Sequence, residues 1–167
     1  MRKPNSSQGV TLIELCFSVA LVAVLATLAV PGFHAALRGA AVRSAMFELT
    51  AGLQQTRTNS IVAARPGVVC LADHTGKCLP GTDSSNGWSA WLDIDGRLQP
   101  LAGGILPEGL VLHASRPRLN FWPDARAAST GTLTICDAQG IARPRAVVLS
   151  QGGRIRLADG NAADCRT

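Results

Sequence analysis

Residues 9–31 read GVTLIELCFSVALVAVLATLAVP, and this stretch decides how the rest of the chain is interpreted. Between residues 10 and 30 the only charged side chain is that of Glu14. A run of about 20 apolar residues can cross a bilayer as a helix, and a carboxylate inside such a run is costly enough to indicate a function. Arg2 and Lys3 precede the run and favour a cytoplasmic position for that end. The segment therefore predicts a single membrane-spanning helix.

A cleaved secretory signal is the alternative for the same segment. Such a signal ends in a cleavage site made of small residues. Pro31 and Gly32 follow the apolar run without a clear A-x-A pattern, although the alanines within the run leave this alternative open.

Beyond Pro31 the chain continues with helical periodicity. Small or apolar side chains recur every three or four residues, as in a helix with one face toward a core. They are Leu37, Ala41, Ala45, Leu49, Leu53 and Thr56. Pro66 and Gly67 predict that the helix ends near Ala64. Pro31 removes one backbone hydrogen bond within the helix and is expected to kink it.

After Gly67 the pattern changes to short apolar runs separated by turn residues such as Gly103-Gly104. Seven of these runs have the composition of strands. They span residues 68–72, 88–94, 110–113, 119–122, 132–136, 146–150 and 154–157. A long helix followed by antiparallel strands predicts an α+β fold, in which the helix packs on the sheet. The expected parts are a transmembrane half at 10–31, an amphipathic helix half at 32–66 and a β-rich head at 67–167.

The stretch GVTLIE at residues 9–14 resembles the class III signal of type IV pilins and type II secretion pseudopilins. The resemblance implies that residues 1–9 are a leader, which a prepilin peptidase cuts between Gly9 and Val10 before the new amino terminus is methylated. It implies that Glu14 sets the register of a filament by pairing with the amino terminus of a neighbouring subunit. Pro31 would be the helix-kinking proline of the family. Val10 stands where the family usually has phenylalanine.

The head resembles the GspH/FimT group of minor pilins and pseudopilins. The matching stretches are LQQTRTNSI at residues 53–61, VVCL at 68–71, WSAWLDID at 88–95, LNF at 119–121, GTLTIC at 131–136 and SQGGRIR at 150–156. The stretch at 88–95 is one residue shorter than the pattern of the group and lacks its glycine. The resemblance covers nearly the whole chain and implies a fold like that of type IV pilins.

The chain has five cysteines, of which Cys16 lies in the apolar run. The other four lie in the head, which the resemblance places in the periplasm, where disulfides persist. Four cysteines allow three pairings. The spacing favours a local bridge between Cys70 and Cys78, and Cys136 and Cys165 would then tie the C-terminal tail to a strand. A zinc site is the alternative, but C-x-x-C spacing and nearby histidines are lacking.

The sequence contains no motif for catalysis. His34, His74 and His113 belong to no nucleophile or metal motif. Asp93 and Asp95 provide too few oxygens for a calcium loop. We therefore expect a protein that is not an enzyme and that holds no metal or cofactor.

Positive charge is concentrated in arginines near the C-terminus. The formal net charge is +5, and residues 101–167 carry eight arginines and five acidic residues, a net charge of +3. Arg154 and Arg156 would share one face of a strand, as would Arg143 and Arg145. If the two segments pair as a hairpin, four guanidinium groups could gather on one side. Such a cluster binds the DNA backbone without reading its sequence, whereas the alternative is a set of solvated arginines.

The segment Gly153-Arg154-Ile155-Arg156 also resembles the G-R-x-R ending of FimT-type minor pilins. The resemblance implies DNA binding during natural transformation, a role associated with FimT-type pilins. Gly153 would leave a backbone N–H group open to a phosphate.

Together these features predict a FimT-type minor pilin. It would be anchored in the inner membrane by one span, hold its head in the periplasm, and join a pilus with other major and minor pilins. Its head would bind double-stranded DNA electrostatically for uptake. The alternatives are a FimU-like structural minor pilin that primes assembly, a GspH-like pseudopilin of a type II secretion system, and an ordinary membrane-anchored protein.

Overall fold

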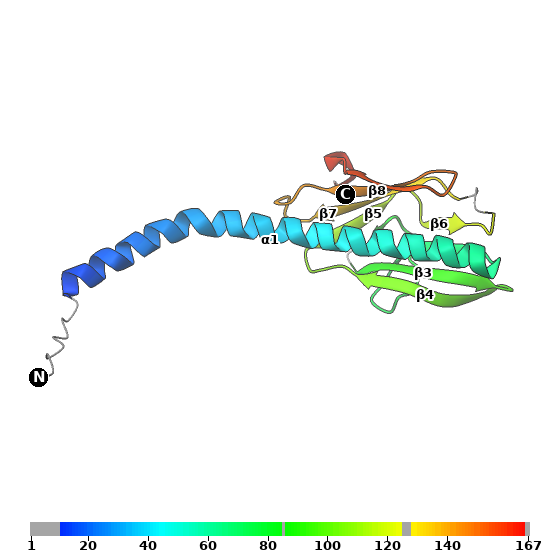
Figure 1. The fold of residues 1–167 in the computed structure, drawn as a ribbon, viewed down its shortest axis with the longest axis horizontal. Coiled ribbons are helices and arrows are strands. Elements are labelled where there is room, and N and C mark those ends of the chain that lie inside the picture. The colour runs from blue at the N-terminus through cyan, green and yellow to red at the C-terminus, as the bar shows by residue number, and fades with distance from the viewer. Residues whose placement is uncertain (1–10, 85, 125–127, 166–167) are drawn as a thin grey trace, which may run out of the picture. The chain divides into compact units, whose positions relative to one another are not determined.

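The computed structural model describes residues 11–84, 86–124 and 128–165, so that Gly9 and Val10 lie outside the described residues. The chain divides into a first unit that ends at Ala36 and a second unit, Leu37–Thr167, which is called the globular unit below. One long helix, α1 (Leu12–Ala63), contributes to both units (Figure 1).

The helix α1 begins with Thr11 as its N-cap residue. The N–H of Glu14 donates to the hydroxyl of Thr11 at 3.4 Å, and the N–H of Leu15 donates to the carbonyl of Thr11 at 3.1 Å. A threonine before the first turn satisfies one of the N–H groups that a helix start leaves free. The carboxylate of Glu14 also lies in the first turn, where the helix dipole favours negative charge.

Up to Ala36 the described side chains of α1 are all exposed, including Leu12 at 80% and Phe17 at 73%. The most apolar 18-residue window of the helix has a mean hydropathy of 2.4, so α1 is long and apolar enough to cross a membrane. Pro31 lies inside the helix and cannot donate a hydrogen bond to the carbonyl of Thr27.

Within the globular unit, one face of α1 enters the core. Val42, Leu49 and Leu53 are at most 1% exposed. The same face continues with two fully buried hydroxyl groups. The hydroxyl of Thr56 donates to the carbonyl of Gly52 at 2.7 Å, and that of Ser60 donates to the carbonyl of Phe121 at 3.1 Å.

The end of α1 is built as the sequence predicts, within one residue. Ala64 adopts a positive φ of 51°, and the N–H of Arg65 donates to the carbonyl of Ser60 at 3.1 Å. This left-handed residue and the Pro66 that follows stop the helix at Ala63.

Two antiparallel sheets pack with α1 around one core. The first has the order β4-β3-β1-β6 and the second the order β2-β5-β7-β8-β9. The strands of the first sheet are β1 (Gly67–Ala72), β3 (Gly87–Ile94), β4 (Arg97–Ile105) and β6 (Arg118–Phe121). Those of the second are β2 (Asp83–Ser84), β5 (Leu110–Ala114), β7 (Gly131–Asp137), β8 (Arg145–Leu149) and β9 (Ile155–Asp159), and a short 3-10 helix, η1 (Ala162–Cys165), follows. The core cluster takes residues from α1 and from both sheets, and the α+β prediction is confirmed.

The sequence pattern does not predict β4, because Gly103-Gly104 is typical of a break between strands. The strand runs through both glycines and pairs with β3 along its whole length. Gly104 allows this close pairing, because a side chain at this position would meet the ring nitrogen of Trp88 and the carboxylate of Glu48. β4 is an exposed edge strand, so its residues show no alternation of apolar and polar side chains.

Candidate nucleic-acid interface

The segments that carry the predicted arginines pair as a hairpin. β8 and β9 are antiparallel, with Val148 opposite Arg156 and Leu149 opposite Ile155. The turn between them is closed by Ser150, whose N–H donates to the carbonyl of Arg154 at 3.1 Å and whose hydroxyl accepts from the N–H of Arg154 at 3.1 Å.

The N–H group of Gly153 is not free, because it forms a hydrogen bond within the turn. Its N–H donates to the carbonyl of Ser150 at 2.9 Å, so the expectation that this group is open to a phosphate was wrong. Gly153 has a φ of 71°, and a side chain on it would come within 3.0 Å of the guanidinium of Arg57. Arg57 on α1 also donates to the carbonyl of Gly152 at 3.5 Å. The absence of a side chain at Gly153 therefore leaves room for Arg57 of α1 to contact this turn.

Arg154 and Arg156 lie on the outer face of the hairpin. Ile155 packs against the core, and side chains alternate along a strand. The residues on either side of Ile155 therefore point away from the core. Both arginines are exposed, and neither has an acidic partner among the described residues. Two unneutralised guanidinium groups thus share one solvent-facing surface.

The predicted cluster of four arginines does not form. Arg145 lies on the same face of β8 as Val147 and Leu149, which pack in the core. It therefore points to the opposite side of the hairpin from Arg156, which stands opposite Val148. It also forms an ion pair with Asp159 across the strands at 2.5 Å. Arg143 precedes β8 and is exposed. The sequence indicated the hairpin correctly, but it did not indicate which strand register places an aspartate opposite Arg145.

A groove that the sequence did not indicate borders the turn. It has a volume of about 560 Å³ and is lined by Arg116, by Gln151 and by hydroxyl groups. The hydroxyl-bearing residues are Ser115, Thr130, Thr132 and Ser150. The hydroxyl of Ser150 also accepts from the backbone N–H of Arg154, so the groove borders the turn that leads to Arg154. The only signal for it in the sequence is the pair of arginines in Arg116-Pro117-Arg118.

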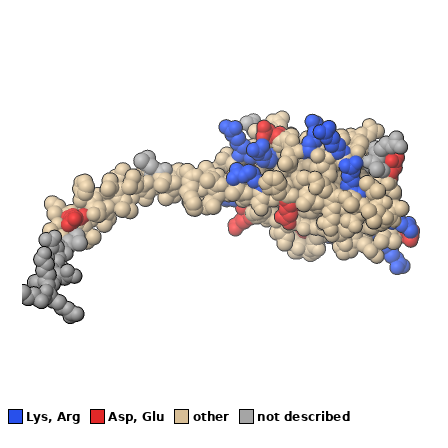
Figure 2. Space-filling model, viewed as in Figure 1, with Lys and Arg blue, Asp and Glu red and all other residues tan. Residues whose placement is uncertain are grey.

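Basic groups are unevenly distributed on the visible face of the globular unit. Figure 2 shows them mainly along the side where Figure 1 places β8, with acidic groups fewer among them. Hydroxyl groups and guanidinium groups are the side chains that bind phosphate oxygens. The outer face of the hairpin and the adjoining groove can therefore hold a polyanion.

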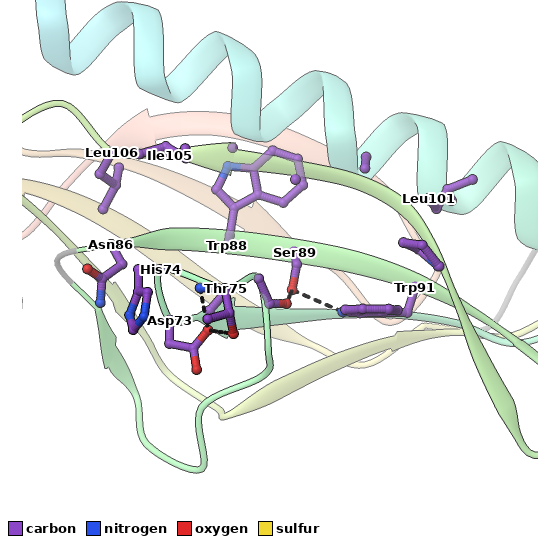
Figure 3. A pocket seen from close by; sticks show the side chains of 16 residues that line it. Asp73, His74, Thr75, Asn86, Trp88, Ser89, Trp91, Leu101, Ile105 and Leu106 are labelled. Atoms are coloured by element: carbon purple, nitrogen blue, oxygen red, sulfur yellow. Dashed lines mark hydrogen bonds between the residues drawn. The ribbon is translucent and has the colours of Figure 1, made fainter.

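A second, larger hollow lies on the first sheet (Figure 3). It has a volume of about 630 Å³ and is lined by residues of the loop that follows β1, by β3 and by the end of β4. Ser89, His74 and Asp73 line it, which are the residue types of a hydrolytic triad. The hydroxyl of Ser89 donates to the carbonyl of Gly76 at 2.8 Å and accepts from the indole N–H of Trp91 at 3.0 Å. The described contacts thus give this serine no general base.

Asp73 organises the loop at one side of this hollow. Its carboxylate accepts from the hydroxyl and the N–H of Thr75, at 2.6 and 2.8 Å, and from the N–H of Lys77 at 3.0 Å. The Thr75 hydroxyl is the main reason that the pKa of Asp73 lies below its ordinary value. Burial acts in the opposite direction, and the N–H groups of Lys77 and Thr75 and the nearby His74 lower the pKa further.

The lowered pKa of Asp73 predicts an acid-sensitive loop. Folding favours the ionised carboxyl, so its contribution is complete above the ordinary pKa of about 4 and is lost as the pH falls through the lowered value. We expect the amide NMR signals of Thr75 and Lys77 to shift with a midpoint below about pH 4, and Asp73→Asn to abolish that transition. A midpoint at or above the ordinary value would contradict these contacts.

The four cysteines of the globular unit form two disulfides. Cys70 pairs with Cys78, with 5.5 Å between their Cα atoms, and Cys136 pairs with Cys165, with 5.6 Å between theirs. This is the pairing that the spacing favours. It removes the zinc alternative, because disulfide sulfurs are not thiolate ligands. Cys16 is unpaired. Within the described part of the chain, no three His, Cys, Asp or Glu residues are placed to hold a metal ion.

Comparison with known proteins gives one family and several similar structures. Residues 45–153 match the sequence profile of the family described as type II transport protein GspH. No curated protein matches the chain.

The similar structures share the fold of the globular unit. The type IV minor pilin FimU of Pseudomonas aeruginosa is 23% identical with a TM-score of 0.54, over 70% of this chain and 87% of FimU. The minor pseudopilin EpsH from the type 2 secretion system of Vibrio cholerae is 16% identical with a TM-score of 0.54, over 70% and 94% of the two chains. Escherichia coli GspH is 14% identical with a TM-score of 0.54, over 73% and 90%.

Proposed function

The chain belongs to the GspH family of type II transport proteins, and from this premise we propose that it is a minor pilin of the FimT type that binds DNA. Membership of the family supports the coarser role, a minor pilin or pseudopilin that assembles with other pilins. The outer face of the β8–β9 hairpin supports the finer one.

The proposed route to the filament follows from α1. Residues 1–9 are removed by a prepilin peptidase between Gly9 and Val10, and the new amino terminus is methylated. Residues 10–31 cross the inner membrane and later enter the filament core, residues 32–66 continue the helix, and residues 67–167 form a periplasmic head. Support comes from the exposed apolar surface of α1 up to Ala36 and from two disulfides, which suit an oxidising compartment.

Processing is the first test of this route. In cells that contain a prepilin peptidase, Gly9→Val is expected to abolish removal of the leader, because the glycine lies at the cut. Val10→Phe, which introduces the usual residue of the family, is the matched control and should be processed normally. Intact-mass measurement of the purified chain distinguishes the two forms. A Gly9→Val chain that still loses residues 1–9 would contradict the proposed signal.

DNA binding is proposed to use Arg154 and Arg156, with Arg116 at the adjoining groove. The single observation that carries the proposal is that the first two arginines share an exposed face without an acidic partner among the described residues. Arg143 can add charge at the other end of the hairpin. Arg145 contributes less because Asp159 neutralises it. Contacts of this kind bind phosphates of double-stranded DNA without selecting a sequence.

A matched pair of double variants tests this site. Arg154→Ala/Arg156→Ala is expected to weaken binding of a short duplex at low salt at least about tenfold. Lys77→Ala/Arg97→Ala removes the same two charges from exposed positions outside the hairpin and the groove, and should have little effect. An equal loss of DNA affinity in the two double variants would show that binding depends only on the net charge of the protein, and would contradict a site at Arg154 and Arg156.

Two structural roles remain as the second candidate function. Similarity of fold to FimU and EpsH favours a minor pilin that primes assembly or a pseudopilin of a secretion system, and neither role needs DNA affinity. Wild-type protein that fails to bind duplex even at low salt would leave these roles as the better account.

A further inference from the structure

The strand β9 has one free edge. It is the last strand of its sheet, with β8 on its other side. The strand register and two backbone hydrogen bonds, from the N–H of Ser150 to Arg154 and from the N–H of Gly160 to Pro144, fix the alternation along the hairpin. In an antiparallel pair, every second residue points its N–H and C=O toward the partner strand. Arg156 and Ala158 therefore face β8, whereas the backbones of Ile155, Leu157 and Asp159 face away from it.

An apolar hollow lies next to this free edge. It has a volume of about 160 Å³ and is lined by Arg43, Met46 and Phe47 of α1 and by Arg145, Leu157 and Ala158 of the hairpin. Phe47 is 63% exposed and Leu157 is 51% exposed. Edge strands are usually protected by short length, charged side chains, proline, bulges or covering elements. β9 is five residues long and carries Arg156 and Asp159, but residues 155–159 contain no proline and pair with β8 without a bulge.

The charge around the hollow favours an acidic partner. Arg43 lines it, and Arg156 projects from the outer face of the same strand. The acid nearest along the strand, Asp159, is already paired with Arg145. A second copy of β9 is a poor occupant, because antiparallel pairing centred on Leu157 would place the two Arg156 side chains diagonally across from each other, and like charges at neighbouring positions destabilise a sheet.

We propose that the free edge of β9 and the hollow at Phe47 and Leu157 bind an extended segment of another polypeptide, in which apolar and acidic side chains alternate. The segment adds a strand to the sheet through the backbone of Ile155, Leu157 and Asp159. Its apolar side chains cover Leu157 and Phe47, and its acidic side chains meet Arg156. This site goes beyond the proposed DNA binding. It shares Arg156 with the proposed DNA-binding surface, but it rests on the hollow and on the backbone edge of β9, which are not phosphate-binding groups.

A labelled eight-residue peptide that alternates valine with glutamate is the probe. Its binding to the full chain in detergent micelles is followed by fluorescence anisotropy, with empty micelles as the blank. Leu157→Pro removes an N–H that faces away from β8, so the hairpin keeps its own hydrogen bonds. We expect Leu157→Pro to weaken binding at least about tenfold, and Leu157→Ala, which keeps the N–H, to weaken it less.

A second probe makes the test independent of any change in the protein. In antiparallel pairing with β9, the valines opposite Leu157 share its face and turn their N–H groups toward β9. The same peptide with N-methylated valines therefore cannot donate these hydrogen bonds, and a peptide with lysine in place of glutamate reverses the charge. Both should bind wild-type protein at least about tenfold more weakly.

Three results would overturn the proposal. The first is the absence of binding of the valine–glutamate peptide to the wild-type chain, and the second is equal binding of the N-methylated or lysine peptide. The third is efficient disulfide cross-linking of two copies carrying Leu157→Cys in the absence of peptide, which would assign the edge to a second copy of the chain. Loss of DNA binding in Arg154→Ala with retained peptide binding would separate this site from the proposed function.

Discussion

Replacing Cys136 and Cys165 by serine is expected to lower the free energy of unfolding of the globular unit by about 3–4 kcal/mol. The two cysteines are 29 residues apart, and cross-linking a loop of that length removes much of the entropy of the unfolded chain. The bridge also holds η1 against the second sheet, where the described side-chain contact is a weak one, from the hydroxyl of Thr134 to Asp164 at 3.5 Å.

The matched control is the other bridge. Cys70 and Cys78 are only eight residues apart, so their replacement by serine should cost about 2.5 kcal/mol in the same chain-entropy account. Urea unfolding of a fragment that starts at Leu37 measures both variants. A smaller decrease in the free energy of unfolding for the Cys136/Cys165 variant than for the Cys70/Cys78 variant would contradict the stabilising role given to the Cys136–Cys165 disulfide.

The contact between α1 and β3 makes a second strong prediction. A Cβ atom added at Gly52 would lie closer than 3.0 Å to three ring atoms of Trp88, a side chain that is only 5% exposed. Gly52→Ala gains about 1 kcal/mol of helix propensity, but overpacking a buried contact costs about 1–3 kcal/mol or more. We expect the cost of the clash to exceed the gain in helix propensity, so that Gly52→Ala lowers the free energy of unfolding.

Gly39 provides the control for this substitution. It lies in the same helix, and its Cβ would meet only the end of the flexible Arg43 side chain at 3.4 Å. Gly39→Ala should therefore be neutral or stabilising by up to about 1 kcal/mol. Thermal unfolding compares the two variants. If Gly52→Ala were as stable as Gly39→Ala, the close packing of α1 on β3 would be incorrect.

Strong local signals made the fold predictable. The apolar run, the three- and four-residue periodicity and the break at Pro66 indicated α1 to within one residue of its end at Ala63. The hairpin β8–β9 was indicated by two short apolar runs around Gly152-Gly153. β4 was missed because an exposed edge strand has no buried face, and thus no alternation, to reveal it.

The candidate site was predictable only in part, because its geometry depends on strand register and on distant segments. The alternation of Arg154 and Arg156 is local and could be read from the sequence. The ion pair of Arg145 with Asp159 depends on which residues of two strands stand opposite each other. The groove at Arg116 depends on a loop lying beside β7 and β8, which begin about 15 and about 30 residues later along the chain.

The salt dependence of duplex DNA binding tests the central claim most directly. The logarithm of the binding constant falls linearly with the logarithm of salt concentration, with a slope set by the number of phosphates contacted. The account predicts that the wild-type chain binds with a clear negative slope, and that Arg154→Ala/Arg156→Ala makes the slope shallower by about 2 while Lys77→Ala/Arg97→Ala leaves it nearly unchanged. The same slope for the wild type and the Arg154/Arg156 variant would contradict a DNA-binding surface on the β8–β9 hairpin.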